Sequence, residues 1–252
     1  WGYRTAAATL PAWLGLHKHA ARVSAGEVHA TVLLRGIASL RAAAVFPDGF
    51  ATWPPDERDA FNEYRRELRE ALRDLGSDTA LLHGMMEELQ RDVASRLAGA
   101  WAPLEEAVHA LSALVKCVAD WARRDAVGAA AASTVKEILS TLASDQGPIL
   151  GGRGHRQLTG TFLMCASLYA PFFVAQTDEV AADVSRPLAE RVFAIARASL
   201  DIVEQPTSGE DEAFPLRVKQ DHLGVVCLLR LCGGGGQAAV AMPKQAAEVL
   251  LQ

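Results

Sequence analysis

The sequence lacks the short motifs that mark catalytic and metal-binding centres. It contains no H-E-x-x-H, no G-x-S-x-G and no C-x-x-C, and its seven histidines do not fall at metal-ligand spacings. The glycine-rich stretch GGRGHR (151–156) lacks the Lys-Ser/Thr pair of a P-loop and the third glycine of a dinucleotide-binding turn, so it is interpreted as an ordinary turn. We therefore predict no catalytic residue, no metal ion and no cofactor, and we expect that the chain is not an enzyme.

Features of secreted, membrane-spanning and nucleic-acid-binding proteins are also missing. No charged segment followed by an apolar core and a cleavage site opens the chain, so no signal peptide is expected. The longest apolar stretch, 161–175, is shorter than a bilayer span and contains Pro171. A formal net charge of −5 argues against a broad nucleic-acid surface. We expect a soluble intracellular protein without membrane insertion or direct nucleic-acid contact. Because the sequence opens on Trp1 rather than methionine, we also expect a piece of a longer chain.

Cysteine is scarce, and its placement favours a reducing compartment. All four cysteines lie inside apolar runs. A cysteine in such a run usually behaves as a small buried hydrophobic residue rather than as half of a disulfide. We predict buried free thiols at Cys117, Cys165, Cys227 and Cys232.

What the sequence does contain is helical periodicity along nearly its whole length. Half of the residues are hydrophobic, which is enough for a substantial core. Apolar residues recur at steps of three and four, and no alternating run bounded by hairpin turns is present. We predict an all-α chain in which 204–213 and 233–236 are loops. The predicted helices are 3–19, 26–46, 57–75, 79–98, 103–122, 131–143, 155–174, 184–201, 214–232 and one from 243.

The helices alternate between two kinds, which indicates stacked helix pairs. Helices with a polar start and an apolar continuation begin near 61, 103, 155 and 214, and those between them are more evenly amphipathic. These starts are roughly 40, 50 and 60 residues apart, and HEAT and armadillo repeats have units of about 40–47 residues, with insertions in the loops. We predict that 1–252 forms a single α-α superhelix, a HEAT/ARM-type solenoid of about five antiparallel helix pairs. A compact helical bundle is the alternative.

Charged side chains are concentrated in FNEYRRELREALRDL (61–75), which is otherwise an amphipathic helix. Arg65, Arg69 and Arg73 recur every four residues and are predicted to share one row. They are candidate partner-binding residues, since arginine suits an acidic or phosphorylated partner, and a solvated helix face is the alternative. The acid pairs Glu87–Glu88 and Glu105–Glu106 fall at predicted surfaces or helix starts, where solvation explains them. Gly76 is the predicted residue just beyond the helix.

Two segments carry a resemblance to a known family. The opening of the charged helix has the pattern aromatic–x–x–aromatic–Arg, with Asp74 near the helix end. A later helix begins with tryptophan and continues with glutamates and an apolar run. This order resembles the middle of nuclear transport receptors of the importin-β (karyopherin) superfamily, most closely the transportin-SR/importin branch. The residues concerned lie within 61–117: Phe61, Tyr64, Arg65, Trp101, Glu105, Glu106, Ala107, Leu111, Leu114 and Val115.

The resemblance implies a function in nucleocytoplasmic transport. Members of the superfamily are HEAT-repeat solenoids that hold protein cargo in a concave arch under the control of Ran·GTP, and they shuttle between nucleus and cytoplasm. Their Ran-binding surface lies mainly in N-terminal repeats that we do not find in this sequence, so no Ran-contact residue is assigned. The arginine-rich cargo helix of this branch comes later in the family's order, so 65–73 does not match it. A non-transport helical-repeat scaffold or regulatory subunit is the alternative, followed by a compact all-α enzyme.

Overall fold

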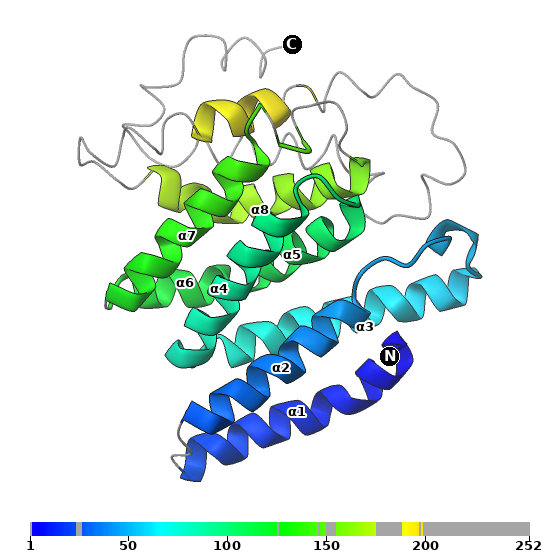
Figure 1. The fold of residues 1–252 in the computed structure, drawn as a ribbon, viewed down its shortest axis with the longest axis vertical. Coiled ribbons are helices and arrows are strands. Elements are labelled where there is room, and N and C mark those ends of the chain that lie inside the picture. The colour runs from blue at the N-terminus through cyan, green and yellow to red at the C-terminus, as the bar shows by residue number, and fades with distance from the viewer. Residues whose placement is uncertain are drawn as a thin grey trace. The chain divides into compact units, whose positions relative to one another are not determined.

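The structure is a computed structural model that describes residues 2–23, 27–124, 126–145, 147–149, 155–174, 188–196 and 198. Within these ranges every regular element is a helix, which confirms the predicted all-α class (Figure 1). None of the described helices is long and apolar enough to span a membrane. The elements are α1 (Tyr3–Val23), α2 (Glu27–Ala43), the short 3-10 helix η1 (Phe50–Thr52), α3 (Pro55–Leu75), α4 (Thr79–Arg96), α5 (Trp101–Ala113), α6 (Val115–Ala122), α7 (Ala126–Leu142) and α8 (Arg156–Val174).

Most predicted helices are found at nearly the predicted bounds, with one clear exception. The predicted helix 103–122 is wrong as a single element, because Leu114 leaves the helix with φ −85° and ψ −3° and separates α5 from α6. In the predicted helix 184–201, residues 188–196 are helical. The remaining predictions lie outside the described residues: the helices 214–232 and from 243, the loops 204–213 and 233–236, and the thiols Cys227 and Cys232.

Local signals in the sequence explain where several helices begin. Pro54 and Pro55 open α3, where a missing backbone N–H costs nothing, and acidic residues in the first turn favour the positive end of the helix dipole. Asp78 caps α4: its side chain accepts hydrogen bonds from the backbone N–H groups of Ala80 and Leu81 at 2.9 and 3.2 Å. Capping and first-turn residues therefore account for the starts of α3 and α4.

Gly76 ends α3 as predicted, but not with the left-handed conformation common at such glycines. Its φ is −68°, an ordinary right-handed value. The reason for glycine is space, since a Cβ there would lie 2.9 Å from Leu114 Cδ2 and 3.2 Å from Cys117 Sγ. The end of α3 thus packs closely against the junction of α5 and α6.

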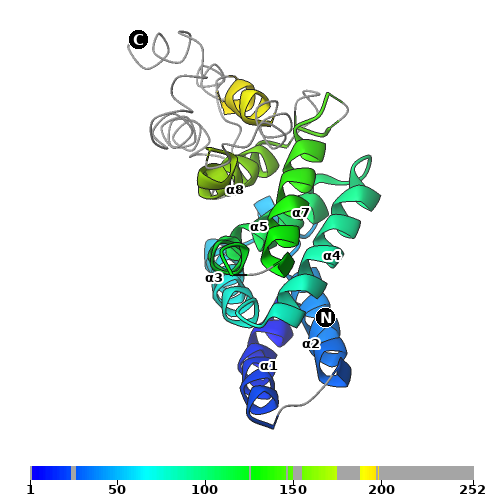
Figure 2. The ribbon, with the colours of Figure 1, turned by 90° about the vertical axis from the view of Figure 1, so that its left-hand side faces the viewer.

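Contacts divide the chain into two compact units, Trp1–Ile138 and Leu139–Gln252. In the first unit the helices pack in two rows. Helix α1 packs against α3, and α3 packs against α5, whereas α2 packs against α4. Figure 2 shows α1 and α3 on one side and α2 and α4 on the other. Cross-contacts between α1 and α2, and between α4 and α5, join the rows.

Both units contain buried apolar residues. In the first unit an aromatic cluster from α1, the α2–α3 connection, α3 and α5 fills the space between helices, with ring centroids 4.9–6.4 Å apart: Tyr3, Phe46, Phe50, Trp53, Phe61, Tyr64 and Trp101. In the second unit α8 is buried along most of its described side chains, including Leu158, Phe162 and Tyr169. The prediction of a single solenoid across 1–252 stays a prediction.

Replacing Gly36 by alanine is expected to destabilise the chain relative to the same change at Gly15. A Cβ at Gly36 in α2 would lie 2.5–2.7 Å from ring atoms of Trp13, whereas at Gly15 in α1 it would meet nothing within 4 Å. Both replacements gain the same helix propensity, about 1 kcal/mol. The overpacking at Gly36 costs about 1–3 kcal/mol, so the two variants should differ by that amount in the free energy of unfolding measured in urea. Equal effects would contradict the α1–α2 packing.

Candidate functional site

Arg65, the first of the three candidate partner-binding arginines, is buried. Its side chain is 5% exposed, and its Nη2 donates to both carboxylate oxygens of Glu105 at 2.8 Å. Nη1 donates to the backbone oxygen of Ala44 at 2.5 Å, and the guanidinium lies 4.3 Å from the centroid of the Phe46 ring. A carboxylate, a backbone oxygen and an aromatic ring of the chain therefore surround this cation. Arg65 is thus buried and bound within the chain, and its role as a partner contact stays a prediction.

The three arginines do not share one face because an α-helix advances 3.6 residues per turn. Each step of four residues rotates the side chain by about 40°, so two steps separate Arg65 from Arg73 by about 80°. Phe61, Tyr64 and Leu68 are buried, and Arg65 lies within that buried face. Arg69 is half-buried and Arg73 is exposed at the end of α3. Only the later arginines reach the surface.

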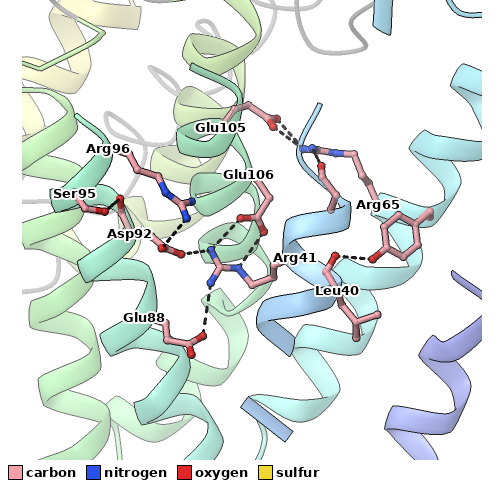
Figure 3. A network of polar contacts seen from close by, with 11 residues as sticks. Leu40, Arg41, Arg65, Glu88, Asp92, Ser95, Arg96, Glu105 and Glu106 are labelled. Carbon is pink, nitrogen blue, oxygen red and sulfur yellow. Dashed lines mark hydrogen bonds and ion pairs between the residues drawn. The ribbon is translucent and has the colours of Figure 1, made fainter. Parts of the chain in front are cut away.

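A second buried arginine, Arg41 of α2, lies in a cluster of acids (Figure 3). Its Nε and Nη2 donate to the two carboxylate oxygens of Glu106 at 3.0 and 2.9 Å, and Nη2 also donates to Asp92 at 3.0 Å. Glu88 of α4 lies 3.9 Å from Nη1. Arg96 binds the other oxygen of Asp92 at 3.1 Å. One cation thus joins α2 to both α4 and α5.

The acid pair Glu105–Glu106, expected to be solvated at a helix start, is instead buried at 0% and 2% exposure. The two neighbouring glutamates point to different arginines, Glu105 to Arg65 and Glu106 to Arg41. The residues around this acid pair in the sequence indicate that it is buried. Helix α5 is apolar on nearly every side, so a carboxylate in its first two turns has no solvated face available. A buried carboxylate requires a cationic partner, which the sequence does not identify.

Burial and neighbouring charges both shift the pKa values of the groups in the Arg41 cluster. Burial lowers the pKa of Arg41, but the charges and hydrogen bonds of Glu106 and Asp92 outweigh it, so the guanidinium pKa is raised. Burial raises the pKa of Glu88; Arg41 opposes this, and Asp92 adds to it by repulsion. Arg41 therefore stays charged, and the surrounding acids are in excess. The pairing is structural, because these groups are already bound to one another.

Arg73 borders an open cavity of about 470 Å³ within the first unit. The lining comes from the C-terminal half of α1, the end of α3 and the region of α6. It consists of His17, Lys18, Arg73, Asp74, Ser77, Lys116, Cys117, Asp120, Trp121 and Arg124. Four of these side chains are cationic, all four exposed, and two are acidic. This cavity is the candidate binding site in the described part of the chain.

Cys117, which lines the cavity, does not have the properties of a reactive thiol. Its Sγ donates to the backbone oxygen of Arg73 at 3.1 Å, and burial, with the nearby charge of Asp120, raises its pKa. A neutral thiol is a poor nucleophile. The predicted buried free thiols are confirmed for Cys117 and Cys165. The described residues include no group of three His, Cys, Asp or Glu placed to hold a metal ion.

Comparison of the chain with protein-family models, with curated proteins and with solved structures finds no match.

Removing the Arg65 charge is expected to be strongly destabilising. Arg65→Met removes the guanidinium that binds the buried Glu105 carboxylate, which should lower the free energy of unfolding by about 3–5 kcal/mol. Because the penalty comes from burying a carboxylate that has lost its guanidinium, Arg65→Met/Glu105→Leu should recover most of it, giving a large coupling energy in a double-mutant cycle. Unfolding in urea measures all variants.

Arg66→Met, one residue further along α3, is the matched control. Arg66 forms an exposed ion pair with Glu63, so its loss should cost less than about 1 kcal/mol. If Arg65→Met proves no more costly than Arg66→Met, the buried pair is absent in solution.

Proposed function

We propose that the chain is a helical-repeat solenoid segment that recognises other proteins, and that it serves in a nuclear transport receptor of the importin-β type. The observation that carries the proposal is the two-row packing of the first unit: α1 against α3, α3 against α5, and α2 against α4. Helices that contact their second neighbours along the sequence make rows that can be extended by adding further pairs. A compact bundle has no need for this regular alternation.

An extended stack supports protein recognition through its shape. Because each repeat contacts only its neighbours, small rotations between repeats add up to a large change in curvature. A partner that favours one curvature then weakens a partner that favours another, by linked binding. A solenoid can therefore load and release protein cargo without carrying out a chemical reaction. That is the property a transport receptor needs, and in this proposal the partners are a protein cargo and Ran.

The two segments that resemble transport receptors contact each other, which supports treating them as one structural unit. Arg65 of the first segment binds Glu105 of the second. Trp101, which opens the second segment, lies with Phe61 in the same aromatic cluster, each within 6 Å of Phe46. The family-like residues thus hold the stack together. In this proposal, other side chains contact the partner.

The transport proposal is tested by the nucleotide state of Ran. The full-length protein is incubated with Ran loaded with GTP or with GDP, and the bound fraction is measured. We expect GTP-selective binding of at least about tenfold, because Ran can control cargo release by its nucleotide state only if its two forms bind with different affinity. The protein should also be found in both nucleus and cytoplasm.

Equal binding of the two forms, or none, would contradict the transport proposal. The stack would then serve in a non-transport scaffold or regulatory subunit, which shares the same packing and needs no response to Ran. A fluorescently labelled Ran·GDP sample at equal concentration is the internal control, because only the γ-phosphate and the conformation it imposes differ.

A further inference from the structure

The cavity beside Arg73 gathers cations from separate elements around one space. Lys18 comes from α1, Arg73 from the end of α3, Lys116 from α6, and Arg124 from the turn after α6. None of these four side chains makes an ion pair with a carboxylate in the described ranges, in contrast to the paired arginines at 4, 41, 65, 66, 96 and 123. The four charges are therefore available to a ligand.

The charge balance of the lining opposes that of the whole chain. The chain carries a formal net charge of −5. The lining has four cationic side chains against Asp74 and Asp120, and Asp120 is itself bound by Arg123 at 2.7 Å. A local excess of positive charge on an acidic protein attracts an acidic ligand to that place.

The walls of the cavity are held in place before any ligand arrives. The Cys117 thiol binds the Arg73 backbone oxygen, and Gly76 allows the end of α3 to approach the α5–α6 junction closely. Arg124 lies 5.4 Å from the centroid of the Trp121 ring, within the range of a cation–π contact. Such support lowers the entropy cost of using these side chains for binding.

We propose that this cavity binds an acidic peptide segment of a protein partner, through carboxylate or phosphoserine side chains. Its volume of about 470 Å³ falls in the usual range of ligand pockets and admits a few side chains rather than a folded surface. Guanidinium groups bind carboxylate and phosphate oxygens with charge-assisted hydrogen bonds. The proposal deepens the protein-binding role given above and rests on it.

A peptide fits the lining better than a nucleic acid does. Nucleic-acid surfaces usually show a continuous basic stripe that follows a phosphate backbone. Here the cations surround a single cavity, and Asp74 and Asp120 lie among them. These acids repel a uniform polyanion and tolerate a peptide in which acidic residues alternate with neutral ones.

The test measures binding of the full-length protein to a degenerate, fluorescently labelled peptide pool. One pool carries glutamate at alternate positions, a second carries phosphoserine, and a third carries glutamine as the neutral control, with random residues between. We expect both acidic pools to bind and the neutral pool not to bind, with affinity that falls as salt rises. The tighter of the two acidic pools identifies the source of the anion. Absence of binding by both would overturn the proposal.

Charge reversal locates the binding to the cavity. Arg73→Glu and Arg124→Glu should each weaken the acidic pool by about tenfold or more. Arg35→Glu makes the same charge change at an exposed residue of α2 outside the lining and should leave binding unchanged. Equal weakening by Arg35→Glu, or no weakening by either cavity variant, would contradict the site. A short RNA of equal charge that binds as tightly as the peptides would contradict the choice of a peptide.

The outcomes also separate this proposal from the transport proposal. Peptide binding without Ran·GTP selectivity would leave the cavity assignment in place and remove the transport function. Ran·GTP selectivity without peptide binding would do the reverse.

Discussion

The first unit depends on one physical constraint: a buried charge must be paired. Arg41 and Arg65 are almost fully removed from solvent, and each finds a carboxylate on α5, Glu106 and Glu105 respectively. Because the two glutamates are adjacent in sequence, they fix the position of α5 along α2 and α3 together. Pairs of this kind add little net stability over an apolar core, but breaking one is costly, so they select one packing arrangement over its neighbours. We infer that they set the position of α5 against α2 and α3 in the first unit.

The same constraint separates structural arginines from those available for binding. Helix α3 carries Arg65 inside the core of the first unit and Arg73 at its exposed end, eight residues later. Only the second borders the cavity with its uncompensated cations. A single helix thus contributes one arginine to the core and another to the candidate site. The two point in different directions because side chains rotate around the helix axis along the sequence.

The sequence predicted the helices well because capping residues and apolar periodicity act locally. Asp78 at the start of α4 and the proline pair before α3 needed no knowledge of the rest of the chain. Pairing across 65 residues, as between Arg41 and Glu106, has no local signal. Burial of Glu105 could have been inferred from the apolar surroundings on α5, but not its partner. The break at Leu114 and the cavity also depend on packing between helices and have no local signal. Of the three predicted binding residues, only Arg73 lines the cavity.

Native-state hydrogen exchange of Arg41→Met tests directly whether the buried charge pairs hold α2, α4 and α5 together. Arg41 of α2 binds Asp92 of α4 and Glu106 of α5, so its loss should release all three helices from one another. Amides of α2, α4 and α5 are expected to lose protection together, because these helices open as one cooperative unit. Loss of protection confined to the turn around residue 41, with α4 and α5 unchanged, would show that the buried charge pairs do not hold these helices together.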